Sequence, residues 1–424
     1  MLALLLALPV LAVLGAWLPL GQGDAQSGAI LREMAATVLP DYLWTTLWLS
    51  LAVAIGAALV GTASAAAVTL FDFAGRRQLE WLLLLPLAMP AYVTAYAYTD
   101  FLQFSGPLQV WLREAFGLQG RLLPEVRSLG GAIWVFIFSL YPYVYLLART
   151  ALGERAAHLM EAARLLGAAP ARRLRSVALP LARPAVAAGV ALVLMETLAD
   201  FGVASYFGIQ TFTTGIYKAW LSMDNRLAAA QLATFLLALV VLLLQLELRA
   251  QRRMRFATGG VGRAGSSEAQ PTRLHGAYAV LAWLVCALPV LMGFALPVLF
   301  MLRPLLADWS LLPWDRFVQW AGNSVRLGAI TAVLAVGIAL ALAFAVRRRR
   351  GPLMRAVVQL VSLGYAVPGA VIVVGLLLPV GWLQAAAPTW GLSALVTTTA
   401  VGIVWAYLVR FCAVALQSVQ SGYA

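Results

Sequence analysis

The sequence has few charged residues, cysteines and histidines for its length, and each shortage excludes a class of protein. Only 11% of its 424 residues are charged and 62% are hydrophobic, a combination that soluble domains rarely show. Cys286 and Cys412 lie in apolar runs, and His158 and His275 are far apart in polar loops. These residues give no disulfide framework, no metal-ligand spacing and no nucleophile–base pair. We therefore expect a membrane protein with several spans, not an enzyme, that binds no cofactor and no stable metal of its own.

Lysine is almost absent, so arginine supplies nearly all of the net charge of +13; Lys218 is the one lysine. The arginines form short clusters between apolar runs, as in the cytoplasmic loops of membrane proteins. This pattern favours a role in topology over nucleic-acid binding. The clusters lie at residues 76–77, 149–183, 249–273 and 347–350. All of them fall on one side of the membrane if the N-terminus is cytoplasmic.

Ten apolar segments are candidates for membrane spans, because about 20 apolar residues cross the hydrocarbon core. They cover residues 2–20, 41–70, 81–102, 129–150, 185–204, 228–248, 276–302, 321–346, 356–379 and 393–416. The expected fold is all-α. Residues 2–20 could instead be a signal peptide, but no basic segment precedes them and no small-x-small cleavage site follows. We therefore favour a first membrane helix.

A polar stretch at residues 249–275, rich in glycine and serine over 258–267, is typical of a linker. It divides the chain into a first unit, residues 1–248, and a second unit, residues 276–424.

Residues of the first unit recur in the second at a constant offset of 278, and the matches include Leu49 with Leu327, Ala54 with Ala332, Arg77 with Arg355, Leu85 with Leu363 and Pro90 with Pro368. This predicts a parallel repeat about an axis normal to the membrane. The second unit stops after its fourth span, so we expect the native protein to continue with two further spans.

The segment at residues 153–183, between the fourth and fifth spans, is too polar to lie in lipid and predicts a helical hairpin. Alanines favour its first helix, and the glycine suits the left-handed residue that ends a helix. A structured loop without a partner is the alternative. The pattern is carried by Glu161, Ala162, Ala163, Gly167, Leu179 and Pro180.

These hairpin residues resemble the signature of the permease subunits of binding-protein-dependent ABC importers. More narrowly, residues 196–208 and 210–217 resemble the fused-repeat permeases of ferric iron importers. The resemblance implies an ABC importer permease (MetI-like) fold with two six-helix halves in the bacterial inner membrane. It also implies a periplasmic iron-binding protein and two ATP-binding subunits as partners, with ATP and Mg²⁺ held by those subunits. The second unit departs from the family because it lacks a second Glu-Ala-Ala hairpin.

Other substrates and mechanisms remain open. Permeases for thiamine, phosphonate, polyamine and sulfate share the scaffold. An ion-gradient-driven secondary transporter and a structural membrane subunit are rivals from other classes. Neither of these needs a cytoplasmic docking hairpin.

Two acids in the fifth predicted span are candidates for the translocation path. Glu196 and Asp200 are four residues apart and would share one helix face. Acids within a span usually face a cavity or a partner, and carboxylates suit a hard cation. A packing contact between helices, or a helix end that reaches water, would explain them as well. Tyr92, Tyr96 and Tyr141 are further path candidates, with an interfacial aromatic belt as the alternative.

Overall fold

The computed structural model describes residues 2–17, 32–153, 157–255, 271–348 and 363–422, together with residues 351, 354, 358 and 361. Helices make up nearly all of this part of the chain, so the prediction of an all-α fold is confirmed. The helices of the first unit are α1 (Leu2–Gly15), α3 (Leu39–Leu70), α4 (Arg76–Leu82), α5 (Ala91–Leu102), α6 (Pro107–Phe116), α7 (Leu129–Ala151), α8 (Ala157–Leu165), α9 (Pro170–Arg173), α10 (Leu179–Ala199), α11 (Gly202–Phe207), α12 (Phe212–Tyr217) and α13 (Arg226–Arg255). Those of the second unit are α14 (Ala277–Val290), α15 (Leu296–Ala307), α16 (Trp314–Arg348), α18 (Gly369–Ala386), α19 (Leu392–Thr398) and α20 (Ala400–Gly422).

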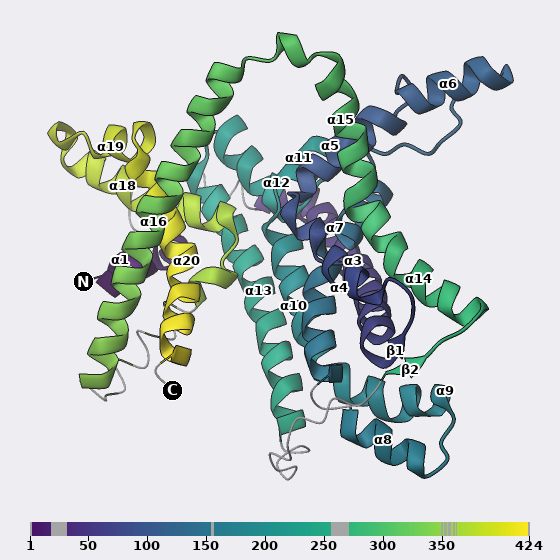
Figure 1. The fold of residues 1–424 in the computed structure, drawn as a ribbon. Coiled ribbons are helices and arrows are strands. Elements are labelled where there is room, and N and C mark those ends of the chain that lie inside the picture. The colour runs from purple at the N-terminus through teal and green to yellow at the C-terminus, as the bar shows by residue number, and fades with distance from the viewer. Residues whose placement is uncertain are drawn as a thin grey trace.

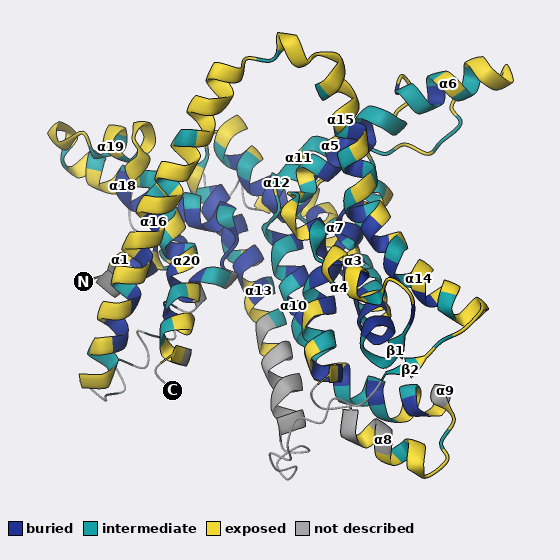
Figure 2. Cartoon of the chain, in the orientation of Figure 1, coloured by how far each residue is buried: buried dark blue, intermediate teal, exposed yellow. Residues whose placement is uncertain are grey.

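Eight helical segments of the described chain are long and apolar enough to cross a membrane. They are Leu39–Leu70, Leu129–Ala151, Leu174–Ala199, Arg226–Leu243, Ala277–Ala307, Trp314–Arg348, Gly369–Ala386 and Ala400–Gln420. The chain is thus a polytopic membrane protein. Much of α16 is exposed (Figure 2), including its apolar residues Val325, Val333 and Phe344, as expected of a surface that faces lipid.

The third and the first predicted spans are not continuous helices of spanning length. The third is broken, because helices 76–88 and 91–116 meet at an angle of 90°. The break lies at Met89, which is extended (φ −114°, ψ 122°), because the ring of Pro90 disfavours a helical conformation in the residue before it. The first span is a helix of only 14 residues that contains Pro9.

Three other boundaries also differ from the prediction. Helix α13 continues to Arg255, so the predicted linker 249–275 begins as a helix, as its arginine, glutamine and methionine residues allow. Helix α18 extends to Ala386, and part of residues 356–362 lies outside the described residues. The last span begins at Ala400, after the separate helix α19.

The first helix of each unit packs against the other unit. Helix α1 contacts α18 and α13, while α14 and α15 contact α3 and α5. Glycine permits both close approaches: a Cβ atom on Gly375 would overlap the carbonyl of Pro9, and one on Gly293 would overlap the carbonyl of Phe138. The two units therefore hold each other through exchanged first helices.

The polar segments gather at one end of the molecule (Figure 1). Helices α8 and α9 lie there with the lower ends of α13 and α16, whereas α6 and the connection from α15 to α16 lie at the opposite end. Two short strands also lie at the lower end, where β1 (Phe71–Asp72) pairs in parallel with β2 (Thr272–Arg273). The C-terminal end of the predicted linker is thus paired with the first unit.

Candidate functional site

The polar segment between the fourth and fifth spans forms a helical hairpin. Helix α8 ends at Leu165, and Gly167 shortly after it has a φ of +78°, the left-handed conformation expected there. The Gly167 amide donates to the carbonyl of Arg164, and the Ala168 amide donates to that of Ala163, each at 3.0 Å. This pair of bonds is a Schellman motif, which satisfies carbonyls left free at the helix end. Local backbone chemistry therefore determines the turn of the hairpin.

The second arm of the hairpin continues into the membrane. Helix α9 passes through a π-helical turn, η3 (Leu174–Ala178), directly into α10. Leu179 and Pro180 form the first turn of α10 and are half-buried. Pro180 lacks a backbone N–H, so one helical hydrogen bond is missing where the π-helical turn passes into α10. A displacement of the hairpin would thus be transmitted along one continuous helical segment.

The tip of the hairpin is apolar. Leu165 and Leu166 are 84% and 87% exposed, and Ala162 is exposed beside them. These leucines were not among the predicted docking residues, although two leucines before a helix-ending glycine in a polar loop are a visible signal in the sequence. The side chain of Glu161 lies outside the described residues. An exposed apolar tip on a hairpin outside the spans is a surface suited to a protein partner.

Glu196, in the last turn of α10, forms an ion pair with an arginine of the other unit. The Nη2 atom of Arg410, on α20, lies 3.2 Å and 3.3 Å from the two carboxylate oxygens. The hydroxyl of Tyr365, in the short helix η7 (Leu363–Ala366), lies 3.5 Å from Oε1. The carboxylate is therefore neutralised by an arginine in this structure, and the role of Glu196 in the translocation path stays a prediction.

Arg410 and Tyr365 were missed in the sequence. A charged residue within an apolar span is costly and marks a functional or paired site. Arg410 is such a residue, at the centre of the segment predicted over 393–416. That signal was present, but the partner of Arg410 lies 214 residues away and no local spacing identifies it.

Asp200 has a different environment from Glu196. Helix α10 ends at Ala199, and Asp200 is the residue that follows it, with φ −72° and ψ 129°. That the two acids share one face stays a prediction. The Oδ1 atom of Asp200 accepts a hydrogen bond of 2.8 Å from the amide of Val203. This bond satisfies a free N–H at the start of α11. The carboxylate thus stabilises the turn between α10 and α11.

The three predicted path tyrosines fall into two groups. Tyr141 is fully buried, and its hydroxyl donates to the carbonyl of Leu83 at 3.0 Å. Leu83 directly follows α4 and lies six residues before the break at Met89, so this bond holds the first part of the third span against α7. A place for Tyr141 on the translocation path stays a prediction. Tyr92 and Tyr96, on α5 beyond the break, are 55% and 46% exposed and remain candidates.

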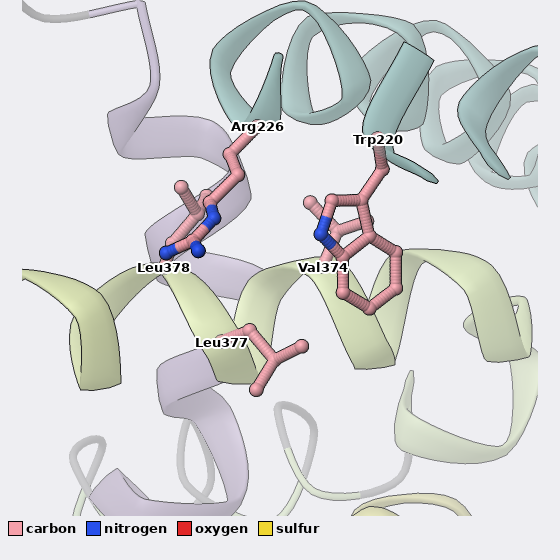
Figure 3. A pocket seen from close by; sticks show the side chains of 5 residues that line it. All are labelled: Trp220, Arg226, Val374, Leu377 and Leu378. Carbon is pink, nitrogen blue, oxygen red and sulfur yellow. The ribbon is translucent and has the colours of Figure 1, made fainter. Parts of the chain in front are cut away.

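The described residues contain no group of three or more His, Cys, Asp or Glu that could hold a metal ion. A shallow recess lies between the units, lined by Trp220, Arg226, Val374, Leu377 and Leu378. Figure 3 shows the side chains of Trp220 and Arg226 extending from the first unit toward α18. Its lining is aliphatic and aromatic apart from one arginine, so the recess is a packing contact between the units and not a candidate site.

The region that contains the hairpin matches a known family of transport proteins. Residues 58–255 match the family described as binding-protein-dependent transport system inner membrane component. Residues 58–255 belong to this permease family. The match runs from within α3 to the end of α13, and so includes the hairpin, Glu196 and Asp200. This family description and the eight apolar helices of the described chain together support a multi-pass protein of the inner membrane.

Proteins similar to this chain are named as permeases for different substrates. A Fe(3+)-transport system permease protein of Haemophilus influenzae is 26% identical over 343 residues, which are 80% of this chain and 63% of the relative. A putative 2-aminoethylphosphonate transport system permease protein of Salmonella choleraesuis is 29% identical over 223 residues, or 52% of this chain and 76% of the relative. A sulfate transport system permease protein of Escherichia coli is 32% identical over 177 residues, or 42% of this chain and 58% of the relative. The chain thus spans less than two thirds of the length of the Haemophilus relative, and the relatives differ in substrate.

Proposed function

We propose that the chain is the transmembrane permease subunit of an ABC importer, which moves its substrate with ATP hydrolysed on partner subunits. The observation that carries the proposal is the hairpin of α8 and α9, with its exposed apolar tip and its direct continuation into a membrane span. A secondary transporter needs no such docking element. This chain itself holds no nucleotide; ATP and Mg²⁺ belong to two ATP-binding subunits at the cytoplasmic face, for which the hairpin is a docking element, and a periplasmic binding protein delivers the substrate.

The orientation follows from the arginine clusters. They favour a cytoplasmic location for the end of the molecule that carries α8, α9 and the lower ends of α13 and α16. The N-terminus is then cytoplasmic. The opposite end, with α6, faces the periplasm and the binding protein.

Ferric iron is the proposed substrate. The support is the extent of similarity, since the match to the iron permease covers 80% of the chain and both units, whereas the matches to the phosphonate and sulfate permeases cover 52% and 42%. An oxyanion such as sulfate or a phosphonate is the second candidate. The pairing of Glu196 with Arg410 favours it, because this contact neutralises the Glu196 carboxylate.

The test is uptake by the complete permease, assembled with its ATP-binding subunits in proteoliposomes. Ferric iron, sulfate and 2-aminoethylphosphonate are each supplied with the cognate binding protein. The proposal predicts uptake of iron that requires ATP hydrolysis. Uptake of sulfate or phosphonate alone would contradict the substrate, and uptake driven by an ion gradient without the ATP-binding subunits would contradict the class.

A further inference from the structure

The ion pair between Glu196 and Arg410 joins a membrane span of the first unit to a span of the second. Glu196 lies in the span Leu174–Ala199 and Arg410 in the span Ala400–Gln420. Two opposite charges in an apolar environment depend on each other, because either one alone carries an uncompensated desolvation cost. The contact therefore ties the relative position of the two units to an electrostatic interaction.

The geometry of the pair is that of a contact that can separate. A single guanidinium nitrogen, Nη2, makes both contacts, at 3.2 and 3.3 Å. A tight arginine–carboxylate pair uses two nitrogens in parallel at about 2.7–2.9 Å. The Nε atom of Arg410 is buried and has no hydrogen-bond partner among the described residues. The two side chains are 26% and 27% exposed, so the pair is not sealed within a core.

Arg410 has an alternative environment within its own unit. Its guanidinium carbon lies 6.0 Å from the ring centroid of Tyr365 and 5.9 Å from that of Phe411. Aromatic faces attract a guanidinium at about this distance. Both rings belong to the second unit and would move with Arg410, so the arginine keeps favourable contacts when the carboxylate is withdrawn.

The position of Glu196 connects it to the hairpin. The chain is helical without interruption from Pro170 through η3 to Ala199. Glu196 is therefore about 35 Å along one helical segment from the hairpin residue Arg173, at about 1.5 Å per residue. Arg410, in contrast, lies on α20, which packs against α16 and η7 of the second unit. A movement of the hairpin relative to the second unit would change this contact directly.

We propose that the Glu196–Arg410 ion pair is a latch between the two units that opens and re-forms during each transport cycle. This inference rests on the proposed function, since a latch acts only in a chain that transports. The alternative is a static contact that stabilises the fold. The two roles differ in whether transport survives when the contact is prevented from opening.

The first experiment bridges the pair covalently. In a complete permease with Cys286→Ala and Cys412→Ala, the substitutions Glu196→Cys and Arg410→Cys are joined by a short, cleavable bis-thiol reagent, and uptake is measured in proteoliposomes before and after bridging. Uptake is compared before and after bridging of the same variant, so the effect of losing the two charges is the same in both measurements. The latch predicts that bridging lowers uptake by about fivefold or more, the range of typical coupling between sites, and that cleavage restores it.

The matched control is a second ion pair within the first unit. Arg149, on α7, contacts the carboxylate of Glu80, on α4. Bridging Glu80→Cys to Arg149→Cys joins two helices of the same unit, and uptake should continue. A bridged Glu196→Cys/Arg410→Cys protein that transports as fast as before bridging would refute the latch.

The second experiment removes each charge singly and then exchanges the two charges. Glu196→Gln and Arg410→Gln should each lower the ratio of substrate moved to ATP hydrolysed by about fivefold or more, and Glu196→Arg with Arg410→Glu should restore it. A static contact would change the yield of folded protein but not this ratio, and an unchanged ratio in both single variants would overturn the proposal. Wild-type protein without ATP-dependent uptake would instead contradict the proposed function, so the two failures can be distinguished.

Discussion

Pro90 and Pro368 immediately precede helices α5 and α18 and have the same backbone conformation. Their φ and ψ angles are −58° and 139° for Pro90, and −58° and 143° for Pro368. Each proline follows a short 3₁₀ turn, η1 (Leu85–Ala88) before Pro90 and η7 before Pro368. The two positions are those that correspond in the predicted repeat of 278 residues, so corresponding residues of the two units have the same local geometry.

We expect Pro90→Ala and Pro368→Ala to destabilise the permease by similar amounts, about 0.4–1 kcal/mol each. Both prolines occupy a φ that suits the ring, so alanine mainly increases the entropy of the unfolded chain. Pro184, in the interior of α10, is the control, because a proline there lacks a helical hydrogen bond and Pro184→Ala should be stabilising. Thermal unfolding in detergent measures all three. Opposite signs for Pro90 and Pro368 would show that the two positions are not equivalent.

Gly167→Ala should destabilise the turn of the hairpin by about 1 kcal/mol, because alanine is strained in the left-handed conformation. Binding of the ATP-binding subunits should weaken while insertion into the membrane persists. Gly322→Ala is the matched control, since Gly322 lies within α16, does not have a positive φ and has open space around its Cβ position. Equal binding by the two variants would contradict a role of the turn in docking.

Asp200→Ala should destabilise the permease by about 1 kcal/mol, the typical cost of losing a helix cap. Asp200→Asn keeps an oxygen that can accept from the Val203 amide and should be nearly silent in both stability and uptake. Thermal unfolding and substrate uptake test the pair of variants together. Loss of uptake in Asp200→Asn at normal stability would contradict a purely structural role and would support a place for Asp200 on the translocation path.

The sequence predicts those parts of the molecule that depend on local chemistry. Long apolar runs indicate α3, α7, α10 and α13, and Gly167 identifies the turn of the hairpin because only its own backbone conformation is involved. The broken third span and the pairing of Glu196 with Arg410 were not predicted. The first depends on how the extended Met89 before Pro90 lets α4 and α5 pack against different neighbours, and the second on a contact between residues 214 apart.

The topology can be tested by thiol labelling in intact cells. In a background without Cys286 and Cys412, cysteines placed at Ser176 and Gly351 should resist an impermeant reagent, because both positions lie beside arginine clusters that favour the cytoplasm. Ser266, in the predicted linker, should also resist; it lies outside the described residues. A cysteine at Gln119, in the exposed connection from α6 to α7, should react and serves as the positive control. Labelling at Ser176 from outside would reverse the orientation of the hairpin.

The most direct test of the docking hairpin is the affinity of the complete permease for its ATP-binding subunits after Leu165→Gln and Leu166→Gln. Both leucines are almost fully exposed, so these substitutions should leave the fold intact. Burial of one leucine contributes about 1.5–3 kcal/mol, so each substitution should weaken binding by about tenfold or more. Leu311→Gln, at an equally exposed leucine in the connection from α15 to α16, is the control and should bind as the wild type does. Wild-type affinity in the variant that carries both hairpin substitutions would contradict the account that this hairpin is the docking site.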